Sequence, residues 1–382
     1  MRRPSAPGAP SGGIDGILLV AVLALCGLGV VMVYSSSAVF ASHRLSDPTY
    51  FLRRQAVAAV LGLVALAACA SLPPERLRPL APTALLFALL ALALVFVPGV
   101  GRSAGGATRW VRLGPLGFQP SELAKPALVL YLAWSLSRKG EQVRQFKAGF
   151  LGPVLVAGTP ILLVLQQPDL GTAVTLAAAV GLLLFVAGVR LRYLLGAAGA
   201  GALAVAWLIY STPWRMRRIV AFLDPWAVRH DEGYQVAESL ISIGSGGLTG
   251  VGLGEGRQKL FFLPEAHTDF IFSIVGEELG LIGTTAVILL FAVFLWRGVR
   301  AAFRAEDAFG AFLALGLTFV LGLQAFLNMA VTMGLLPTKG LPLPFVSYGG
   351  TSLVLSMAAA GILLSIGRGQ GGFLARHLGA RR

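Results

Sequence analysis

The segment Leu263–Phe270 (LPEAHTDF) places several groups that could do chemistry directly before a long apolar run. Asp269 falls at the start of a helix that we expect over residues 269–296, where the helix dipole tolerates a carboxylate and a lone Asp is usually only an N-cap. His267 or Thr268 could supply that cap instead. A carboxylate that is free of capping can serve as a general base. We therefore take Asp269 as the candidate catalytic residue, with His267 and Thr268 as candidate substrate contacts.

Two further acids, Glu277 and Glu278, follow on the same expected helix. The helical rise puts Glu277 about 12 Å beyond Asp269 and roughly 80° round the helix from it. Glu278 falls on the opposite face. We therefore predict that Glu277 faces a substrate cavity together with Asp269, and that Glu278 makes a structural pair.

The string 119–125 (QPSELAK) begins another expected helix, and Glu122 and Lys125, three residues apart, share a face of it. A charge inside a membrane costs about 2.5–3.5 kcal/mol on insertion scales, so this pair needs an explanation. It is either a buried ion pair that only fixes packing or a polar patch that faces a cavity. We favour the patch, with Gln119 beside it, because the pair follows a basic loop that contains Arg109.

The segment Gly334–Gly350 holds three prolines and four glycines in 17 residues, so it cannot form the interior of a helix. Irregular backbone is tolerated at membrane depth only where it lines protein or water, and the segment is too apolar for an ordinary external loop. We predict a re-entrant segment with Lys339 and Ser347 toward the substrate. The alternative is that Lys339 only anchors the loop among lipid headgroups.

Asp169 follows Pro168 at the start of one apolar run, and Arg215 and Arg218 follow Trp214 at the end of another. These three charges could be ordinary interfacial anchors or part of a site. Carboxylates can act as bases, and clusters of Arg and Lys stabilise phosphate charge. The sequence has no P-loop, Gly-x-Ser-x-Gly elbow or His-rich metal site. The energy for a reaction would then come from an activated substrate, such as a lipid-linked diphosphate.

Membrane helices must position these residues. Hydrophobic residues make up 56% of the 382 and charged residues only 13%, against about 25% charged in ordinary globular proteins. The expected fold is all-α, a polytopic membrane protein of about ten transmembrane helices, since each span needs about 20 apolar residues. The apolar stretches that predict the helices are 14–35, 55–71, 79–97, 121–137, 148–166, 171–189, 192–210, 269–296, 308–333 and 348–366.

Most Lys and Arg residues fall on the side of these helices that carries both termini, which predicts that the N- and C-termini are cytoplasmic. The same bias accounts for the net charge of +14 without nucleic-acid binding. The chemical groups above then face the outside. We expect a single transmembrane domain over 14–366 between flexible cytoplasmic tails, 1–13 and 367–382. One long extracytoplasmic loop, 211–268, lies between helices 7 and 8 and is expected to contain short helices.

The two cysteines, Cys26 and Cys69, both lie in apolar runs. Their positions argue against a disulfide framework and against a thiolate metal site. The 4 histidines are too scattered for a cluster of ligands. The residues themselves therefore indicate no cofactor.

Several strings match those of a known family, in the family's order and over nearly the whole chain. The chain resembles the SEDS family, named for shape, elongation, division and sporulation. Two of the strings, YSSS and LPTKGLPLPF, resemble the division branch of that family more than the elongation branch. The matching strings are Tyr34–Ser37 (YSSS), Thr108–Trp110 (TRW), Gln119–Lys125 (QPSELAK), Gln167–Thr172 (QPDLGT), Leu263–Phe272 (LPEAHTDFIF), Gly276–Gly280 (GEELG) and Leu336–Gly350 (LPTKGLPLPFVSYGG).

The resemblance implies a peptidoglycan glycosyltransferase for septal cell-wall synthesis in cell division. Such an enzyme polymerises lipid II, a disaccharide-pentapeptide on undecaprenyl diphosphate, at the outer face of the bacterial cytoplasmic (inner) membrane. The resemblance also implies that Asp269 is the essential catalytic residue and that Glu122 and Lys125 belong to the active-site cavity. The implied partners are a class B penicillin-binding protein, which supplies transpeptidation, and other membrane proteins of the division machinery.

Our hypothesis for the mechanism is that Asp269 takes the proton from the 4-hydroxyl of the acceptor sugar, which attacks the anomeric carbon of the donor. Lys125, Arg109 and Lys339, with a divalent cation (Mg²⁺ or Mn²⁺) as a candidate cofactor, would stabilise the departing undecaprenyl diphosphate. A competing function is that of a lipid II flippase, since intramembrane charges and broken helices also suit transport. A third, a non-catalytic scaffold, leaves the acid–base cluster unexplained.

Overall fold

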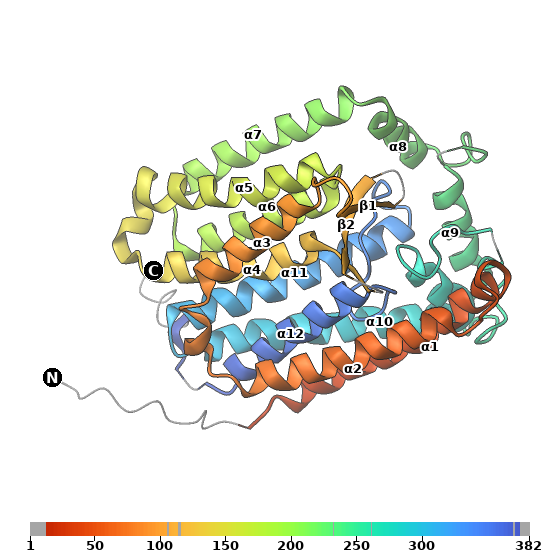
Figure 1. Ribbon diagram of the computed structural model, residues 1–382, viewed down its shortest axis with the longest axis horizontal. Helices are drawn as coiled ribbons and strands as arrows, with labels where there is room; N and C mark the ends of the chain where they lie inside the picture. The colour runs from red at the N-terminus through yellow and green to blue at the C-terminus, as the bar shows by residue number, and fades with distance from the viewer. Residues whose placement is uncertain are drawn as a thin grey trace.

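The computed structural model describes residues 13–104, 107–113, 116–231, 233–260, 262–369 and 371–374. Most of the chain forms helices that run along one common direction (Figure 1). Two short helices, α8 (Pro213–Leu223) and α9 (Tyr234–Ser245), lie with a small sheet at one end of the bundle. Short helical turns of other types are η1 (Pro74–Leu77), η2 (Gly140–Arg144) and η3 (Phe146–Leu151). The longer helices are α1 (Gly16–Leu45), α2 (Tyr50–Ser71), α3 (Ala81–Leu94), α4 (Pro120–Ser137), α5 (Gly152–Gln166), α6 (Leu170–Ala187), α7 (Leu191–Tyr210), α10 (Ile271–Arg304), α11 (Ala308–Thr332) and α12 (Gly350–Ile366).

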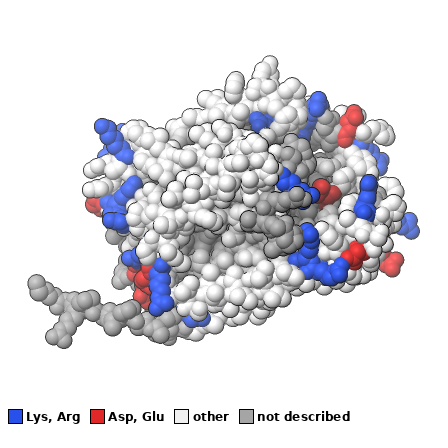
Figure 2. Space-filling model, in the orientation of Figure 1, with Lys and Arg blue, Asp and Glu red and all other residues white. Residues whose placement is uncertain are grey.

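Seven helices in the described part of the chain are long and apolar enough to cross a membrane. They are α1, α2, the continuous stretch Phe146–Gln166 that ends in α5, α6, α7, α10 and α11. In Figure 2 the charged side chains gather toward the two ends of the visible face and leave a broad, largely uncharged band between them. Such a band fits the apolar interior of a bilayer, so the protein is a multi-pass membrane protein. The number of ten spans stays a prediction, since α3 and α12 are shorter apolar helices.

The helix α11 forms the centre of the bundle and packs against α10, α4 and α6. Small residues allow these close approaches, because helices in lipid associate mainly through close packing. At Gly316, for example, an added Cβ would lie only 2.5 Å from Cγ1 of Val129 on α4. The central position matters for the site because α11 also carries two buried amide side chains, Gln324 and Asn328.

By contrast, α7 lies at the edge of the bundle (Figure 1) and has no buried residue. Its side chains Leu203, Trp207 and Tyr210 are among the most exposed hydrophobic groups of the molecule. The helix is therefore held mainly through its ends, one of which leads into α8.

The expectation of an all-α fold is wrong in one region. Three short antiparallel strands form a sheet in the order β1–β2–β3, with Val111 paired to Phe118 across the second and third strands. These strands do not form apolar runs, because they are short and mixed in polarity, although Thr108, Trp110 and Val111 are residue types that favour strands. The strands are β1 (Gly101–Ala104), β2 (Ala107–Leu113) and β3 (Leu116–Phe118).

The helix α10 is broken at Gly280, whose φ of 64° lies in the left-handed region. The segment 246–256, here called the glycine strap, crosses the break and supplies the missing hydrogen bonds. Four backbone bonds join them: Val251 N–H to Glu277 O (2.9 Å), Gly252 N–H to Glu278 O (3.1 Å), Leu281 N–H to Gly247 O (2.9 Å) and Ile282 N–H to Leu248 O (3.1 Å). The backbone groups freed by the break are thus satisfied, as burial in a membrane protein requires.

Glycines make this contact between two backbones possible. A Cβ built on Gly250 would lie 2.1 Å from Glu278 O, and one built on Gly280 would lie 2.3 Å from Gly250 N. Both residues also have positive φ angles, which only glycine adopts without strain. The sequence of the strap is therefore dictated by its approach to α10.

Candidate active site

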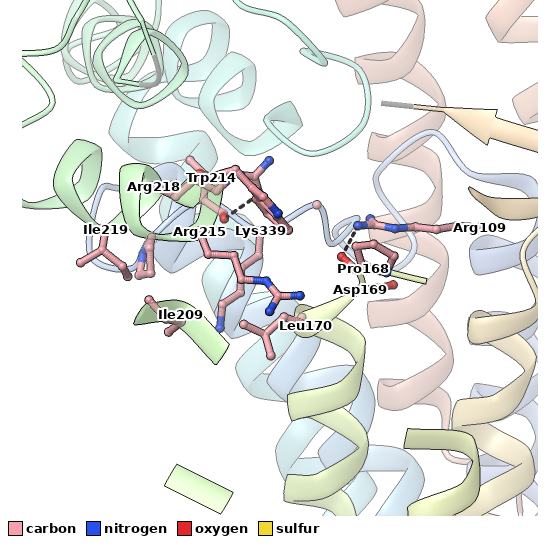
Figure 3. A pocket seen from close by; sticks show the side chains of 14 residues that line it. Arg109, Pro168, Asp169, Leu170, Ile209, Trp214, Arg215, Arg218, Ile219 and Lys339 are labelled. Atoms are coloured by element: carbon pink, nitrogen blue, oxygen red, sulfur yellow. Dashed lines mark hydrogen bonds between the residues drawn. The ribbon is translucent and has the colours of Figure 1, made fainter. Parts of the chain in front are cut away.

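A cavity of about 70 Å³ lies between β2, the start of α6, the end of α7, α8 and the segment that follows α11 (Figure 3). Its lining includes Arg109, Asp169, Arg215, Arg218 and Lys339. These residues come from four separate parts of the chain, so the fold gathers charges that are far apart in the sequence. Four of the five are cationic, which suits an anionic group.

Asp269 lies beside this cavity, next to Gly340 of its lining. A Cβ built on Gly340 would be 3.1 Å from Oδ2 of Asp269 and 3.9 Å from Nη1 of Arg109. The carboxylate and the guanidinium therefore approach the same backbone position. A side chain at residue 340 would intrude between them.

The environment of Asp269 shifts its acidity strongly. The pKa of Asp269 is raised from 3.8 to about 7, first by burial and then by the neighbouring carboxylate of Glu265. The cations Arg109 and Arg218 act in the opposite direction, while the carboxylate of Asp169 again raises the pKa. A carboxylate with a pKa near neutrality is suited to accept a proton at physiological pH.

The prediction that a helix begins at Asp269 is wrong by two residues. The helix α10 begins at Ile271, and its N-cap residue, Phe270, makes no side-chain capping bond. Asp269 lies instead in the preceding turn, where the N–H of Phe270 donates to the carbonyl of Glu265 (3.2 Å). The turn keeps the carboxylate away from the capping role that would otherwise be its most common use.

Two amide side chains of α11 hold the backbone around Asp269. Asn328 Nδ2 donates to the carbonyls of Asp269 (2.8 Å) and Leu341 (2.7 Å), and one turn earlier Gln324 Nε2 donates to the carbonyl of Pro342 (2.8 Å). Neither amide was predicted from the sequence, because each is flanked on both sides by apolar residues. The available signal was their spacing of four residues, which places them on one helical face.

Glu122 and Lys125 form a buried ion pair with 2.7 Å between Lys125 Nζ and Glu122 Oε1. Lys125 Nζ also donates to Gln324 Oε1. The pair therefore supports the segment after α11 and is not part of the lining of the 70 Å³ cavity. Gln119 precedes α4, and its backbone N–H donates to Thr351 Oγ1 (3.3 Å). Substrate contacts by these three residues stay predictions.

Arg109 holds the turn before α6. Its Nε donates to the carbonyl of Gln167 (3.0 Å) and its Nη2 to the carbonyl of Pro168 (2.6 Å; Figure 3). Asp169 then caps α6, since its Oδ1 accepts the Thr172 N–H (3.0 Å) and its Oδ2 accepts the Thr172 hydroxyl (2.8 Å). Asp169 thus has a capping role at the cavity wall, and a direct substrate contact stays a prediction.

Three cations line the opposite side of the cavity. The guanidinium carbons of Arg215 and Arg218 lie 5.0 and 5.3 Å from the ring centre of Trp214, and Arg218 Nη1 donates to the carbonyl of Thr338 (3.3 Å; Figure 3). Lys339 Nζ has no hydrogen bond or ion pair within the part of the chain that the structure describes, and burial lowers the pKa of Lys339. A partly buried ammonium without a partner is available to an anionic ligand.

Glu277 does not line the cavity beside Asp269, and a substrate contact of Glu277 stays a prediction. Glu277 Oε1 accepts the backbone N–H groups of Arg257 (2.6 Å) and Gln258 (3.2 Å), and its Oε2 accepts the hydroxyl of Ser242 (3.3 Å). The physical reason is that the break in α10 lets the outer loop cover this face of the helix. Any substrate contact of Glu277 would require the loop to leave.

The predicted structural pairing of Glu278 is confirmed. Its Oε1 lies 2.6 Å from Lys259 Nζ in a buried ion pair. The same carboxylate accepts the hydroxyl of Ser35 on α1 (2.6 Å) and the N–H of Gly254 in the glycine strap (3.1 Å). Glu278 therefore joins α1, α10 and the strap.

The remaining predicted contacts stabilise the segment before α10. The ring of His267 lies 4.6 Å from that of Phe51, measured between centroids, and burial lowers the pKa of His267. Thr268 Oγ1 donates to Glu265 Oε2 (2.8 Å), and Ser347 Oγ donates to the carbonyl of Thr268 (2.6 Å). Ser347 thus connects the Pro-rich segment to the turn that carries the candidate base, and direct substrate contacts of these residues stay predictions.

The chain is similar to known proteins over nearly all of its length. It is 48% identical to a probable peptidoglycan glycosyltransferase FtsW of Geobacter sulfurreducens (strain ATCC 51573 / DSM 12127 / PCA) over 353 residues, which cover 92% of this chain and 94% of that one. It is 50% identical to a protein of the same name from Thioalkalivibrio sulfidiphilus (92% and 88% covered). It is 39% identical to the stage V sporulation protein E of Bacillus subtilis (93% and 97% covered).

Solved structures support the same relationship. The crystal structure of the rod shape determining protein RodA of Thermus thermophilus matches with a TM-score of 0.70 at 33% identity, covering 94% of this chain and 98% of that one. A chain of a solved peptidoglycan synthase complex matches with a TM-score of 0.77 at 33% identity (93% and 98% covered). The family described as cell cycle proteins FtsW, RodA and SpoVE matches residues 16–371. The chain therefore belongs to the FtsW/RodA/SpoVE family, the SEDS family that its motifs resemble.

Proposed function

We propose that this protein is a peptidoglycan glycosyltransferase that polymerises lipid II into glycan strands for septal cell-wall synthesis. The observation that carries the proposal is the carboxylate of Asp269, with a pKa of about 7, beside a cavity lined by Arg109, Arg218 and Lys339. Relatives at 45–50% identity are named as probable peptidoglycan glycosyltransferases, which supports the same reaction.

The reaction needs a base and an anion site. The ionised carboxylate of Asp269 takes the proton of the acceptor's 4-hydroxyl as the oxygen attacks the anomeric carbon of the donor. A new C–O glycosidic bond forms, the bond from the anomeric carbon to the diphosphate oxygen breaks, and its electron pair leaves with undecaprenyl diphosphate. Fixed cations stabilise that developing charge at little cost in reorganisation.

We assign the cavity to the phosphate end of the donor. The cations Arg109, Arg218 and Lys339 in its lining suit a phosphate group. Lys339 is the residue that we expect to bind the phosphate, because its ammonium has no partner among the described residues. Arg109, by contrast, already donates two of its N–H groups to backbone carbonyls. Lys125 would act on the diphosphate only after release from Glu122.

A divalent cation, Mg²⁺ or Mn²⁺, is a further proposal for the diphosphate. Within the described ranges, no group of three or more His, Cys, Asp or Glu side chains could hold a metal ion. A cation held jointly by substrate phosphates would need fewer protein ligands. The proton and charge steps above are therefore assigned to side chains alone.

The proposed setting is the bacterial cytoplasmic membrane. Both termini are placed in the cytoplasm, the domain 14–366 spans the bilayer, and the loop 211–268 with the cavity faces outward, in keeping with the distribution of Lys and Arg. The proposed partners are a class B penicillin-binding protein and other division proteins. A similar chain occurs in a peptidoglycan synthase complex described as coordinating polymerization and crosslinking, which supports a crosslinking partner.

The competing function, a lipid II flippase, is suggested by the ion pair of Glu122 and Lys125 buried inside the bundle. Purified protein, alone and with its transpeptidase, should be incubated with lipid II in detergent. Because detergent leaves no membrane to cross, glycan strands on a gel would establish the enzyme. Failure to make glycan in both samples, together with movement of labelled lipid II across liposomes, would instead establish the flippase.

A further inference from the structure

Asn328 occupies an unusual place in α11. Its side chain is 2% exposed within a mostly apolar helix. Both hydrogens of its amide are used, one on the carbonyl of Asp269 (2.8 Å) and one on the carbonyl of Leu341 (2.7 Å). One side chain thus bridges the turn before α10 and the Pro-rich segment after α11.

The orientation of this amide follows from its partners. Turning it over would place Oδ1 against two carbonyl oxygens, so the nitrogen must face them. Oδ1 then lies buried without a hydrogen-bond partner among the described residues. A buried polar atom without a partner is unfavourable in free energy. The two hydrogen bonds donated by Nδ2 offset that unfavourable free energy.

The two carbonyls belong to segments that meet at the candidate base. Leu341 follows Gly340, whose α-carbon lies so close to Asp269 that an added Cβ would be 3.1 Å from Oδ2. Lys339, a cation of the cavity lining that has no partner among the described residues, comes directly before Gly340. The bridge therefore fixes the separation between Asp269 and the segment that carries Lys339.

We propose that Asn328 is a positioning residue for glycosyl transfer, which keeps the carboxylate of Asp269 at a set distance from the cation-bearing segment 339–341. This inference rests on the proposed function. Gln324 supports the same segment at Pro342, but it does not reach Asp269. Ser347 also joins the Pro-rich segment to the turn, through the carbonyl of Thr268, but among the described residues only Asn328 bonds both Asp269 and Leu341 by its side chain.

Loss of the bridge has two separate consequences. Misplacement of reacting groups by about 1 Å can cost about a hundredfold in rate, so turnover should fall. Separation of the segments would also admit water to the carboxylate, whose raised pKa is due first to burial. The pKa of Asp269 should then fall toward its ordinary value, and the acid limb of the pH–rate profile should move to lower pH.

The test uses the full-length protein with its transpeptidase and lipid II. Asn328→Ala removes both donors, and Asn328→Leu keeps a side chain of similar size but offers no donor to the two carbonyls. Both variants should lower kcat by about tenfold or more, change KM for lipid II much less, and move the acid limb down by about one pH unit.

Two variants of α11 serve as controls. Thr318→Val removes a buried hydroxyl that has no partner among the described residues and should leave kcat and the pH profile unchanged. Leu317→Ala creates a cavity in the same helix, which should lower the unfolding temperature without moving the acid limb.

The outcomes distinguish failure of the positioning role of Asn328 from failure of the proposed glycosyltransferase function. If both Asn328 variants keep the wild-type acid limb and lose turnover only as far as Leu317→Ala does, Asn328 is an ordinary structural residue and the inference is overturned. If wild-type protein forms no glycan, the proposed function itself fails, and if Asp269→Asn forms as much glycan as wild type, the assignment of Asp269 as the base fails. A shifted acid limb with low kcat in both Asn328 variants supports the positioning role.

Discussion

Two requirements compete at the carboxylate of Asp269. A base must be ionised, yet burial beside Glu265 favours the neutral form and raises the pKa to about 7. The guanidinium of Arg109 partly offsets this effect. A substantial fraction of the Asp269 carboxyl is therefore ionised near neutral pH and can accept a proton. Its raised pKa should affect the pH dependence of protein stability as well as that of the reaction rate.

Asp269→Asn should lower polymerisation by at least about a hundredfold, since a positioned base contributes about 10²–10⁴-fold.

The same variant should change how stability depends on pH. The pKa of Asp269 is raised in the folded state, so the stability linked to this carboxyl is fully present below the unfolded-state pKa of 3.8 and is lost as the pH rises through about 7. The Asn variant does not titrate. Its unfolding temperature, measured by thermal melts in detergent, should exceed that of wild type by more at pH 8 than at pH 5.

The exposed Asp231 provides the control, and Asp231→Asn should change neither activity nor this pH dependence. Equal activity of Asp269→Asn and wild type, or a stability difference that is constant from pH 5 to 8, would contradict the assignment.

Lys339→Ala should lower lipid II turnover by about tenfold or more, because a charged hydrogen bond to phosphate is lost. Lys339→Arg should keep part of the rate, since it retains the charge but not the point-like geometry. Steady-state rates in detergent measure the effect, with the exposed Lys147→Ala as a control. If Lys339→Ala folds and turns over normally, the lysine is only a headgroup anchor.

The sequence was informative about the charged residues of the site and silent about their supports. The sequence predicted three charged residues of the site, Asp269, Arg109 and Lys339. A charge near the membrane interior is energetically costly, so such a residue usually has a function or an ionic partner. Asn328 could not be predicted, because a single amide in an apolar run has no chemical signature until its two carbonyl partners are known.

At the scale of elements, the glycine strap explains a pattern that the sequence leaves open. Its glycines look like those of a flexible loop, yet several of them make close backbone contacts with α10. Gly250 and Gly254 form a natural pair for comparison, because their φ angles of 83° and 87° are nearly equal. An added Cβ at Gly250 meets Glu278 O at 2.1 Å, whereas at Gly254 it meets nothing within 4 Å.

Gly250→Ala should therefore destabilise the protein more than Gly254→Ala does. Both substitutions carry the cost of a positive φ, roughly 1 kcal/mol, but only Gly250→Ala also pushes the strap from the helix. Thermal melts of the two variants measure the difference. Equal losses would mean that the strap can move aside without cost.

Element boundaries were the weakest part of the sequence prediction. The apolar pattern located α10 but placed its start at Asp269, since periodicity cannot distinguish the first helical residue from the turn before it. The break at Gly280 could not be predicted from the sequence pattern of α10 either. Its hydrogen bonds come from the strap, about thirty residues earlier in the chain, and no local pattern reports a partner that far away.

For the whole molecule, the distribution of charge decides orientation. The helices α8 and α9 lie at one end of the bundle (Figure 1), and α8 supplies part of the lining of the cavity. The basic turns around η2 belong to the predicted cytoplasmic side. The long apolar helices could be located from the sequence, but their orientation in the membrane depends on a statistical rule and needs its own test.

Cysteine labelling provides that test. In a chain with Cys26→Ala and Cys69→Ala, a cysteine at the exposed Leu253 of the strap should react with an impermeant maleimide in intact cells. A cysteine at the exposed Glu141 of η2 should react only after the cells are opened. The reverse pattern would invert the topology and place the candidate site in the cytoplasm.

The docking of the strap on α10 has a consequence for amide exchange. A break in a helix ordinarily leaves the next amides open to solvent, but here the N–H groups of Leu281 and Ile282 are bonded to strap carbonyls. Their exchange with deuterium therefore requires release of the strap rather than unwinding of α10. These two amides are built-in reporters of an outer-loop motion, readable without any label in the chain.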